Sequence, residues 1–131
     1  DKDKIEKVIE ITKERLVRLE DINSLTHYLF LEDISYDKEL LVWKSLTIED
    51  VKNNLKEILG ILEGVLGENW NKRYLEGLIF PYLKENDKKN GDYLWPLRVS
   101  LSGQKNSPSP FELAHALGKE ESLKRIKKAI N

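Results

Sequence analysis

The 131-residue chain contains no cysteine and no methionine. Without cysteine the chain can form neither a disulfide framework nor a thiolate zinc site, and a reducing compartment fits this absence. Because a reading frame starts with methionine, its complete absence leads us to expect a domain cut from a larger protein. No run of 18 apolar residues exists, which argues against a transmembrane helix. The charged opening DKDKIEKVIE is not typical of a secretory signal, so a cytoplasmic location is expected.

Positive and negative charges nearly balance overall, with 22 Lys or Arg against 23 Asp or Glu, but they are unevenly placed. The net charge of −1 alone does not favour a strong nucleic-acid binder. Residues 96–131, however, carry seven Lys or Arg against three Glu, a balance of +4, so the rest of the chain carries −5. With 40% hydrophobic and 34% charged residues, the composition is that of a globular domain. The distribution predicts a polarised molecule whose C-terminal part faces an anion.

The spacing of apolar residues is helical almost everywhere, which predicts an all-α fold. We expect an irregular bundle or cage of seven or eight helices, placed at about residues 4–20, 22–31, 40–43, 47–66, 69–86, 92–102, 109–118 and 119–130. Thr47 is predicted as an N-cap and Gly67 as a left-handed helix stop. Pro81 is expected to kink or divide its helix. Gly60 and Gly64 would permit close approach of a neighbouring helix.

The chain is expected to divide near the connector at 32–37 and the helix start at Thr47. Residues 1–45 would form a helical subdomain that leads into a C-terminal helical subdomain, residues 46–131.

One stretch, residues 95–118, combines several signals in a short space. A helix with Asp92 as its N-cap should end at Gly103 in the left-handed C′ position, before the polar loop 104–108. Ser109-Pro110-Phe111-Glu112 then restarts a helix with a capping box and a proline in its first turn. This pattern predicts a displayed corner between two helices.

The corner offers the chemistry by which proteins read single-stranded RNA, whose bases are splayed out, stacked and hydrogen-bonded at their edges. Arg98 supplies a fork of donors, and Ser102 and Ser107 supply hydroxyls. Pro108 and Phe111 supply flat apolar surfaces for stacking. Each has an ordinary alternative: Arg98 as a surface or salt-bridged group, Phe111 as a core residue, and the Ser-Pro-Ser-Pro run as a turn.

No catalytic or metal site is predicted in this chain. His27 and His115 lie far apart in the sequence and fit packing or surface positions better than a base or ligand. Glu120 and Glu121 fit first-turn charges that complement the helix dipole. The glycines between 60 and 67 lack the strand and the Gly-Lys-Ser/Thr of a phosphate-binding loop.

The order of residues also resembles a known family. The matching run is Pro96-Leu97-Arg98-Val99-Ser100-Leu101-Ser102-Gly103, a loop, Pro108, Phe111-Glu112, Leu117-Gly118-Lys119-Glu120 and Arg125. It is similar to the C-terminal signature P-L-R-V-A-L-T-G, loop, G-P-x-L-F-E, L-G-K-E-R-A-L-x-R-L of bacterial-type glutamyl-tRNA synthetases. Upstream, Glu14-Arg15-Leu16, His27-Tyr28-Leu29-Phe30 and Tyr36-Asp37 resemble E-R-x-x-T-L-x-E-L…Y-F-F…Y-D of the same enzymes.

The resemblance implies a helical, cage-like region that grips the tRNA anticodon loop. It implies contacts from the site residues to the anticodon, with Arg98, Ser107 and Pro108 at the second and third bases, Phe111 at the border of the same pocket, and Ser102 and Pro110 beside them. Arg15 or Arg18 would lie near the first base. Three positions depart from the pattern, since Ser102 replaces Thr, Pro110 replaces Leu and Glu121 replaces Arg.

The resemblance further implies a parent that attaches glutamate to tRNA-Glu, with ATP and Mg²⁺ bound in a catalytic domain whose signatures are absent here. The expected partner of this monomeric part is tRNA-Glu, with neither DNA nor membrane. Two other functions stay open. One is a helical protein–protein interaction module that uses apolar surface around Trp43 or Trp70. The other is a DNA-binding helix-turn-helix within residues 110–130.

Overall fold

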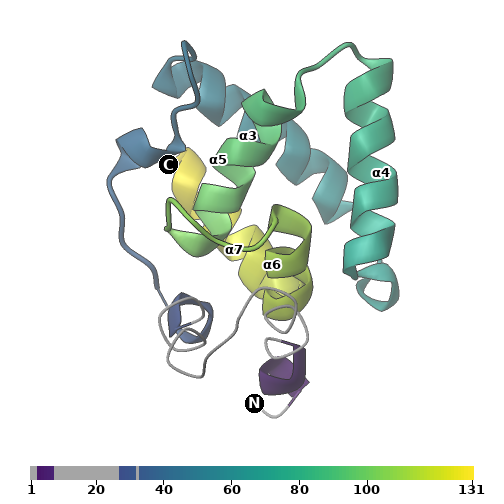
Figure 1. Ribbon diagram of the computed structural model, residues 1–131. Coiled ribbons are helices and arrows are strands. Elements are labelled where there is room, and N and C mark those ends of the chain that lie inside the picture. Colours follow the sequence, from purple (N-terminus) through teal and green to yellow (C-terminus); the bar gives the residue numbers. More distant parts are fainter. Residues whose placement is uncertain (1–2, 8–26, 32) are drawn as a thin grey trace.

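The computed structural model describes residues 3–7, 27–31 and 33–131. All regular structure in these ranges is helical, which confirms the predicted all-α class (Figure 1). Besides the helical residues 3–7, the elements are η1 (His27–Phe30), η2 (Lys38–Leu41), α3 (Ile48–Glu63), η3 (Gly67–Asn69), α4 (Lys72–Glu85), α5 (Asn90–Ser102), α6 (Pro110–Leu117) and α7 (Lys119–Ile130). Within the described ranges there are six α-helical segments, slightly fewer than the seven or eight expected for the chain. The helix expected at 40–43 is the 3-10 turn η2, and the described end of the one expected at 22–31 is the 3-10 turn η1.

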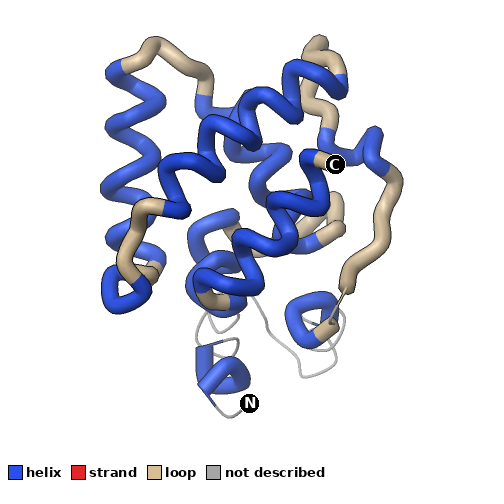
Figure 2. Tube along the Cα trace, turned by 180° about the vertical axis from the view of Figure 1, so that it is seen from behind, coloured by secondary structure: helices blue, strands red, loops and turns tan. Residues whose placement is uncertain are grey.

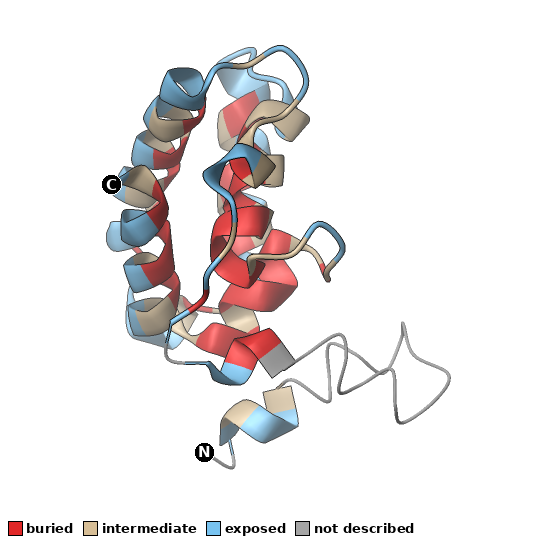
Figure 3. Cartoon of the chain, turned by 90° about the vertical axis from the view of Figure 1, so that its left-hand side faces the viewer, coloured by how far each residue is buried: buried red, intermediate tan, exposed pale blue. Residues whose placement is uncertain are grey.

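Helix α5 lies at the centre of the arrangement. It packs against α3, α6, α7 and η2, while α4 stands at the side of the bundle and packs against α6 (Figures 1 and 2). Helices α3, α4 and α7 each bury one face, as the 3.6-residue spacing requires; on α3 the buried residues are Val51, Leu55, Ile58 and Leu62. Helix α6, in contrast, is buried on nearly all sides. Figure 3 shows the buried faces turned toward one shared interior. None of the described helices has the length and apolarity that a membrane crossing needs.

The start of α3 is as predicted, but its end is not. The Thr47 hydroxyl accepts from the Asp50 amide at 3.1 Å, and the Asp50 carboxylate accepts from the Thr47 amide at 3.0 Å, a complete capping box. The helix stops at Glu63 rather than near Gly67, and Gly64 caps it at φ −80°, in the right-handed region. The Gly64 amide donates to the carbonyls of Ile61 and Leu62, and the Lys119 ammonium donates to the carbonyls of Glu63 and Val65.

Gly60 and Gly64 do not serve close helix packing. A Cβ on Gly60 would meet nothing within 4 Å, and one on Gly64 would meet only the carbonyl of Ile61 in its own helix. The close approach occurs instead at Gly91, where a Cβ would lie 2.4 Å from Nε1 of Trp43. Glycine is therefore required at Gly91 because an indole ring occupies that space.

Two further helix boundaries correct the expectations. Helix α4 runs undivided through Pro81, which lies on its exposed side, while Leu75, Ile79 and Leu83 hold the opposite face in the core. Helix α5 starts at Asn90 without a side-chain cap, so Asp92 lies inside its first turn. There the Asp92 carbonyl accepts from the Asn54 side-chain amide at 3.1 Å.

The segment before residue 45 joins the same core as the rest. Tyr28, Leu29, Ile34 and Leu41 are buried together with the side chains of α3 to α7. The Trp95 indole donates to the Leu40 carbonyl at 2.9 Å. The hydrophobic core of the described residues therefore continues across the expected boundary at 45/46, and the division into two subdomains stays a prediction.

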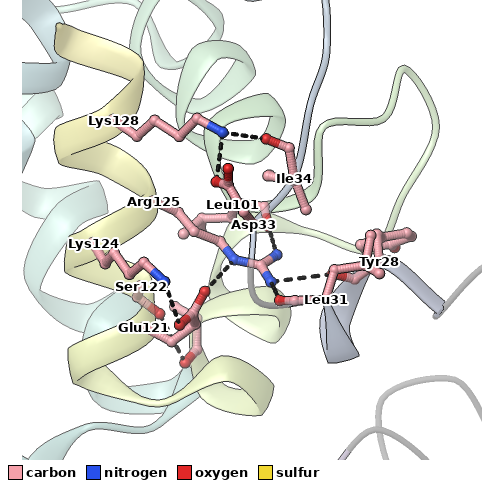
Figure 4. A network of polar contacts seen from close by, with 11 residues as sticks. Tyr28, Leu31, Asp33, Ile34, Leu101, Glu121, Ser122, Lys124, Arg125 and Lys128 are labelled. Atoms are coloured by element: carbon pink, nitrogen blue, oxygen red, sulfur yellow. Dashed lines mark hydrogen bonds and ion pairs between the residues drawn. The ribbon is translucent and has the colours of Figure 1, made fainter.

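Arg125 ties the N-terminal segment to the C-terminal half (Figure 4). Its guanidinium, 3% exposed, donates to the carbonyls of Tyr28 at 3.1 Å, Leu31 at 2.8 Å and Leu101 at 2.7 Å. Its Nε also donates to the Glu121 carboxylate at 2.8 Å. The planar fork of an arginine suits these divergent acceptors, which a lysine could not satisfy together.

Candidate nucleic-acid interface

The corner predicted after α5 is present. Gly103 ends the helix at φ 67° and ψ 17°, and its amide donates to the Val99 carbonyl at 2.6 Å, which confirms the left-handed cap. A Cβ here would also lie 3.1 Å from Cδ1 of Tyr36, so the position requires glycine for space as well as for conformation. Burial raises the pKa of Tyr36 to about 12, so this ring is neutral at physiological pH.

The restart of the chain as α6 is also as predicted. The Ser109 hydroxyl accepts from the Glu112 amide at 3.2 Å, and the Glu112 carboxylate accepts from the Ser109 amide at 3.3 Å. Pro110 stands in the first turn, where its missing amide is not needed. The loop 104–108 is thus fixed at both ends by backbone geometry.

Arg98 folds back onto this loop. Its Nη1 donates to the Ser107 hydroxyl at 2.9 Å and its Nη2 to the Lys105 carbonyl at 2.8 Å. The Ser107 hydroxyl donates in turn to the Pro108 carbonyl at 2.8 Å. The guanidinium carbon lies 4.7 Å from the centroid of the Trp95 ring, a cation–π distance. Arg98 and Ser107 therefore meet, and together they set the shape of the loop.

Ser102 acts inside the corner. Its side chain is fully buried; the hydroxyl donates to the Arg98 carbonyl at 2.9 Å and accepts from the Gln104 amide at 3.1 Å. These bonds close the last turn of α5 and fix the first residue of the loop. Ser102 is thus placed to support the loop from behind.

The three apolar residues of the predicted site are buried. Pro108 and Pro110 lie beneath the surface, and Phe111 is 3% exposed. The ring of Phe111 packs against Phe80 of α4, with centroids 5.2 Å apart and planes tilted by 55°. Of the two open interpretations of Phe111, burial favours the core residue over the stacking platform. Anticodon contacts from the six predicted residues stay a prediction.

The sequence reasoning missed Trp95, which lies against Arg98. Positions three apart on a helix share a face, and this spacing could have indicated the pair. Trp95 also stacks on Trp43, with ring centroids 4.9 Å apart, and the Lys44 ammonium lies 5.3 Å from the Trp43 ring. Two indoles and two cations are therefore gathered beside the loop.

The tryptophans do not provide the apolar docking surface considered for a protein-binding module. Trp70 is 7% exposed, and its indole donates to the Ala114 carbonyl at 2.8 Å. Trp43 is half-buried against Trp95 and Gly91. Both rings are committed to packing within the chain.

Most cations of residues 96–131 have partners inside the molecule. Lys119 donates to carbonyls at the end of α3, and Lys127 pairs with Glu63 at 3.6 Å. Lys128 donates to the Asp33 carboxylate and the Ile34 carbonyl, each at 2.5 Å (Figure 4). The hydrogen bond from Lys128 lowers the pKa of Asp33, so the carboxylate stays ionised. Most of the cations that give residues 96–131 their excess positive charge therefore make contacts within the molecule.

Some predicted residues lie elsewhere. Arg15 and Arg18 fall outside the described residues, as does the side chain of His27. His115 is half-buried on α6. Across the described ranges, no group of three His, Asp or Glu side chains is placed to hold a metal ion.

Comparison with known proteins adds an independent finding. A family model described as "Anticodon binding domain" matches residues 1–130. The glutamate–tRNA ligase of Clostridium botulinum (strain Eklund 17B / Type B) is 44% identical over 105 residues, which cover 77% of this chain and 22% of that protein. The glutamate–tRNA ligase of Clostridium acetobutylicum is 36% identical over 129 residues, which cover 96% of this chain and 26% of that protein.

The fold has a solved counterpart. A glutamate tRNA ligase from Elizabethkingia meningosepticum, crystallised with its amino acid, matches with a TM-score of 0.80 over 99% of this chain and 25% of that one, at 24% identity. That identity shows a shared fold. The chain spans about a quarter of the length of the curated relatives it matches.

Proposed function

This chain belongs to the anticodon-binding domain family, and we propose that it is the part of a glutamate–tRNA ligase that binds the anticodon loop of tRNA-Glu. The family match over residues 1–130 carries the proposal. In the parent protein, a separate catalytic region would join glutamate to the tRNA with ATP and Mg²⁺. A cytoplasmic location, where tRNA is charged, and a monomeric state belong to the same proposal.

The geometry of the corner supports this function. A rigid cap at Gly103 and a capping box at Ser109 hold a polar loop between two helix ends. Arg98 lies at the mouth of this corner with its guanidinium oriented by Trp95 and Ser107. An oriented arginine fork suits a phosphate or a base edge that carries two adjacent acceptors.

We assign different tasks to the six predicted residues. Arg98 and Ser107 would contact the second and third anticodon bases, because both are only half-buried. Ser102, Pro108, Pro110 and Phe111 are buried and would keep the loop in the shape that the RNA meets. Pro110 in the first turn of α6 leaves no amide to donate there, so recognition of the third base would fall to neighbouring groups.

The test is a titration of the chain with a tRNA-Glu transcript, a transcript with an altered anticodon and duplex DNA, each at two salt concentrations. We expect tRNA-Glu to bind most tightly and with moderate salt dependence, because few phosphates are neutralised. Arg98→Ala should weaken tRNA-Glu binding about tenfold or more, since a good bidentate contact contributes about 1–3 kcal/mol. Lys56→Ala, an exposed substitution on α3, serves as the control.

Equal binding of the three nucleic acids, or no binding at all, would contradict the proposed function. If Arg98→Ala binds RNA more weakly but still prefers the correct anticodon, Arg98 shapes the loop and does not read a base. Binding of a protein partner that ignores salt and RNA would instead favour the interaction module.

A further inference from the structure

Three lysines at the end of α4 and in the α4–α5 turn differ from those of α7 in making no close polar contact within the chain, although Lys88 interacts electrostatically with Glu57. Among the residues that the structure describes, Lys84, Lys88 and Lys89 make no ion pair and no side-chain hydrogen bond, and all three are exposed. The lysines near the C-terminus, in contrast, bind carbonyls or carboxylates of the chain. Uncommitted cations can bind an external anion without first breaking an internal bond.

These lysines surround an exposed aromatic ring. A shallow hollow on the surface is lined by Phe80, Lys84, Asp87, Lys88, Lys89 and Asn90, which we call the lysine hollow. It lies where α4 turns into α5 at the end of the bundle (Figure 1). Its three lysines face one aspartate, so its charge is positive. Phe80 is 37% exposed, and burying a ring of this size against a ligand would be favourable.

The backbone holds the hollow in a defined shape. Asp87 adopts the left-handed conformation at φ 54°, the Lys88 amide donates to the Leu83 carbonyl at 2.8 Å, and the Asp87 amide donates to the Lys84 carbonyl at 3.2 Å. The Asn86 side-chain amide donates to the Tyr82 carbonyl at 2.8 Å. These bonds fix the turn, so the lysines start from a set backbone position.

Phe80 connects the lysine hollow to the Arg98 corner. Its ring packs against Phe111, the second residue of α6, which lies three residues after the end of the loop. Phe111 thus supports Phe80 from the buried side and leaves Phe80 as the aromatic residue that reaches the surface. Phe80 is therefore positioned to stack on a base, which is the role that the sequence suggested for Phe111.

We propose that the lysine hollow is a second contact surface for the same tRNA, with Lys84, Lys88 and Lys89 on backbone phosphates and an unstacked base on Phe80. The proposal rests on the proposed function, since the ligand is the RNA held at the Arg98 corner. Cations around an exposed aromatic ring are the combination that binds single-stranded nucleic acid. The positive charge favours RNA over an apolar protein surface.

The test measures binding of a tRNA-Glu transcript to the 131-residue chain over a range of salt. Phe80→Leu keeps apolar contact with Phe111 but removes the ring, and it should weaken binding about tenfold, within the range for one stacked base. Phe80→Trp should bind as the unaltered chain does. The triple variant Lys84→Gln, Lys88→Gln, Lys89→Gln should lower the slope of log affinity against log salt by about 2, at roughly 0.7 per phosphate contact.

Matched controls separate a local contact from general effects. Tyr74→Leu removes another exposed ring of α4, 43% exposed, and should not change affinity. Lys52→Gln, Lys56→Gln, Lys127→Gln removes the same charge from α3 and α7 and should leave the slope unchanged. Circular dichroism melting confirms that each variant is folded.

Each outcome of these binding measurements either supports or overturns the proposed contact surface. If the unaltered chain binds no tRNA-Glu, the proposed function and this surface both fail. If the unaltered chain binds tRNA-Glu but Phe80→Leu or the triple lysine variant binds it equally well, the lysine hollow does not contact this RNA. Only the further inference then fails. Equal losses in the controls would likewise overturn it.

Discussion

Replacing Arg125 by Met should destabilise the protein far more than any exposed substitution. Met has similar length and stays apolar, so the variant deletes the guanidinium with little change in packing volume. The deletion leaves three carbonyls, those of Tyr28, Leu31 and Leu101, without this donor, and it leaves Glu121 without its 2.8 Å partner.

The magnitude follows from the burial of these groups. Arg125 is 3% exposed, and Glu121 retains 24% side-chain exposure. Breaking a buried charge pair by removing one partner costs about 3–5 kcal/mol, and each buried polar group left unpaired costs about 1–3 kcal/mol. Because Glu121 can turn toward water, we expect the lower part of this range, about 3 kcal/mol. Arg125→Lys should lose nearly as much, since one ammonium cannot reach the divergent carbonyls.

The assay is urea unfolding followed by circular dichroism, with the free energy of unfolding taken from the midpoint and slope. The matched control is Lys124→Met, which touches the same Glu121 at 3.9 Å from a 58% exposed position. That change should alter stability by less than about 1 kcal/mol, as exposed pairs do. The reasoning about Arg125 is refuted if the two variants unfold at the same urea concentration with the same slope.

Two other substitutions test the local physics. Gly103→Ala should lower the free energy of unfolding by about 1–2 kcal/mol, measured in the same urea assay, because φ 67° disfavours a Cβ and Tyr36 lies in its way. Burial acts to raise the pKa of Glu57, but hydrogen bonds from Tyr82 and Tyr93 outweigh it and lower the pKa below the ordinary 4.5. This lowering stabilises the fold above about pH 4.5 and is lost as pH falls through the folded pKa, so Glu57→Gln should flatten the fall of Tm between about pH 5 and 3; an unchanged acid limb would contradict this.

Local signals predicted most helix starts from residue 47 onward, because the starts of α3, α4 and α6 each have a side chain that caps the backbone. Thr47 and Ser109 form the capping boxes their spacing indicated, and Gly103 adopts the left-handed cap. The errors occur where a distant residue decides. At the end of α3 the carbonyls of Glu63 and Val65 accept from Lys119, more than fifty residues away, and the early start of α5 brings Gly91 against Trp43. The apolar periodicity of a short stretch of sequence contains no information about such long-range contacts.

The candidate site shows the same contrast between local signals, which were predictable, and long-range packing, which was not. Arg98, Ser102 and Ser107 are brought together as their placement around a cap and loop indicated. Exposure was less predictable, since nothing in the sequence says that Phe111 lies under Phe80. Whether an aromatic ring stacks on a base or packs on a neighbouring helix depends on which elements pack together in the tertiary structure. The local sequence does not determine this.

The charge pattern illustrates why counting residues can mislead about where RNA would bind. Six of the seven cations in residues 96–131 have a partner within the chain, and Lys105 is the exception among the described contacts. A lysine ammonium already bound to a carbonyl or carboxylate gains less from a phosphate, because its first contact must be lost, whereas Arg98 has five N–H donors. The available cations of the lysine hollow lie in residues 1–95, the part of the chain whose net charge is negative. A binding surface is therefore better sought from uncommitted charges than from a local sum, and the hollow beside Phe80 meets that criterion.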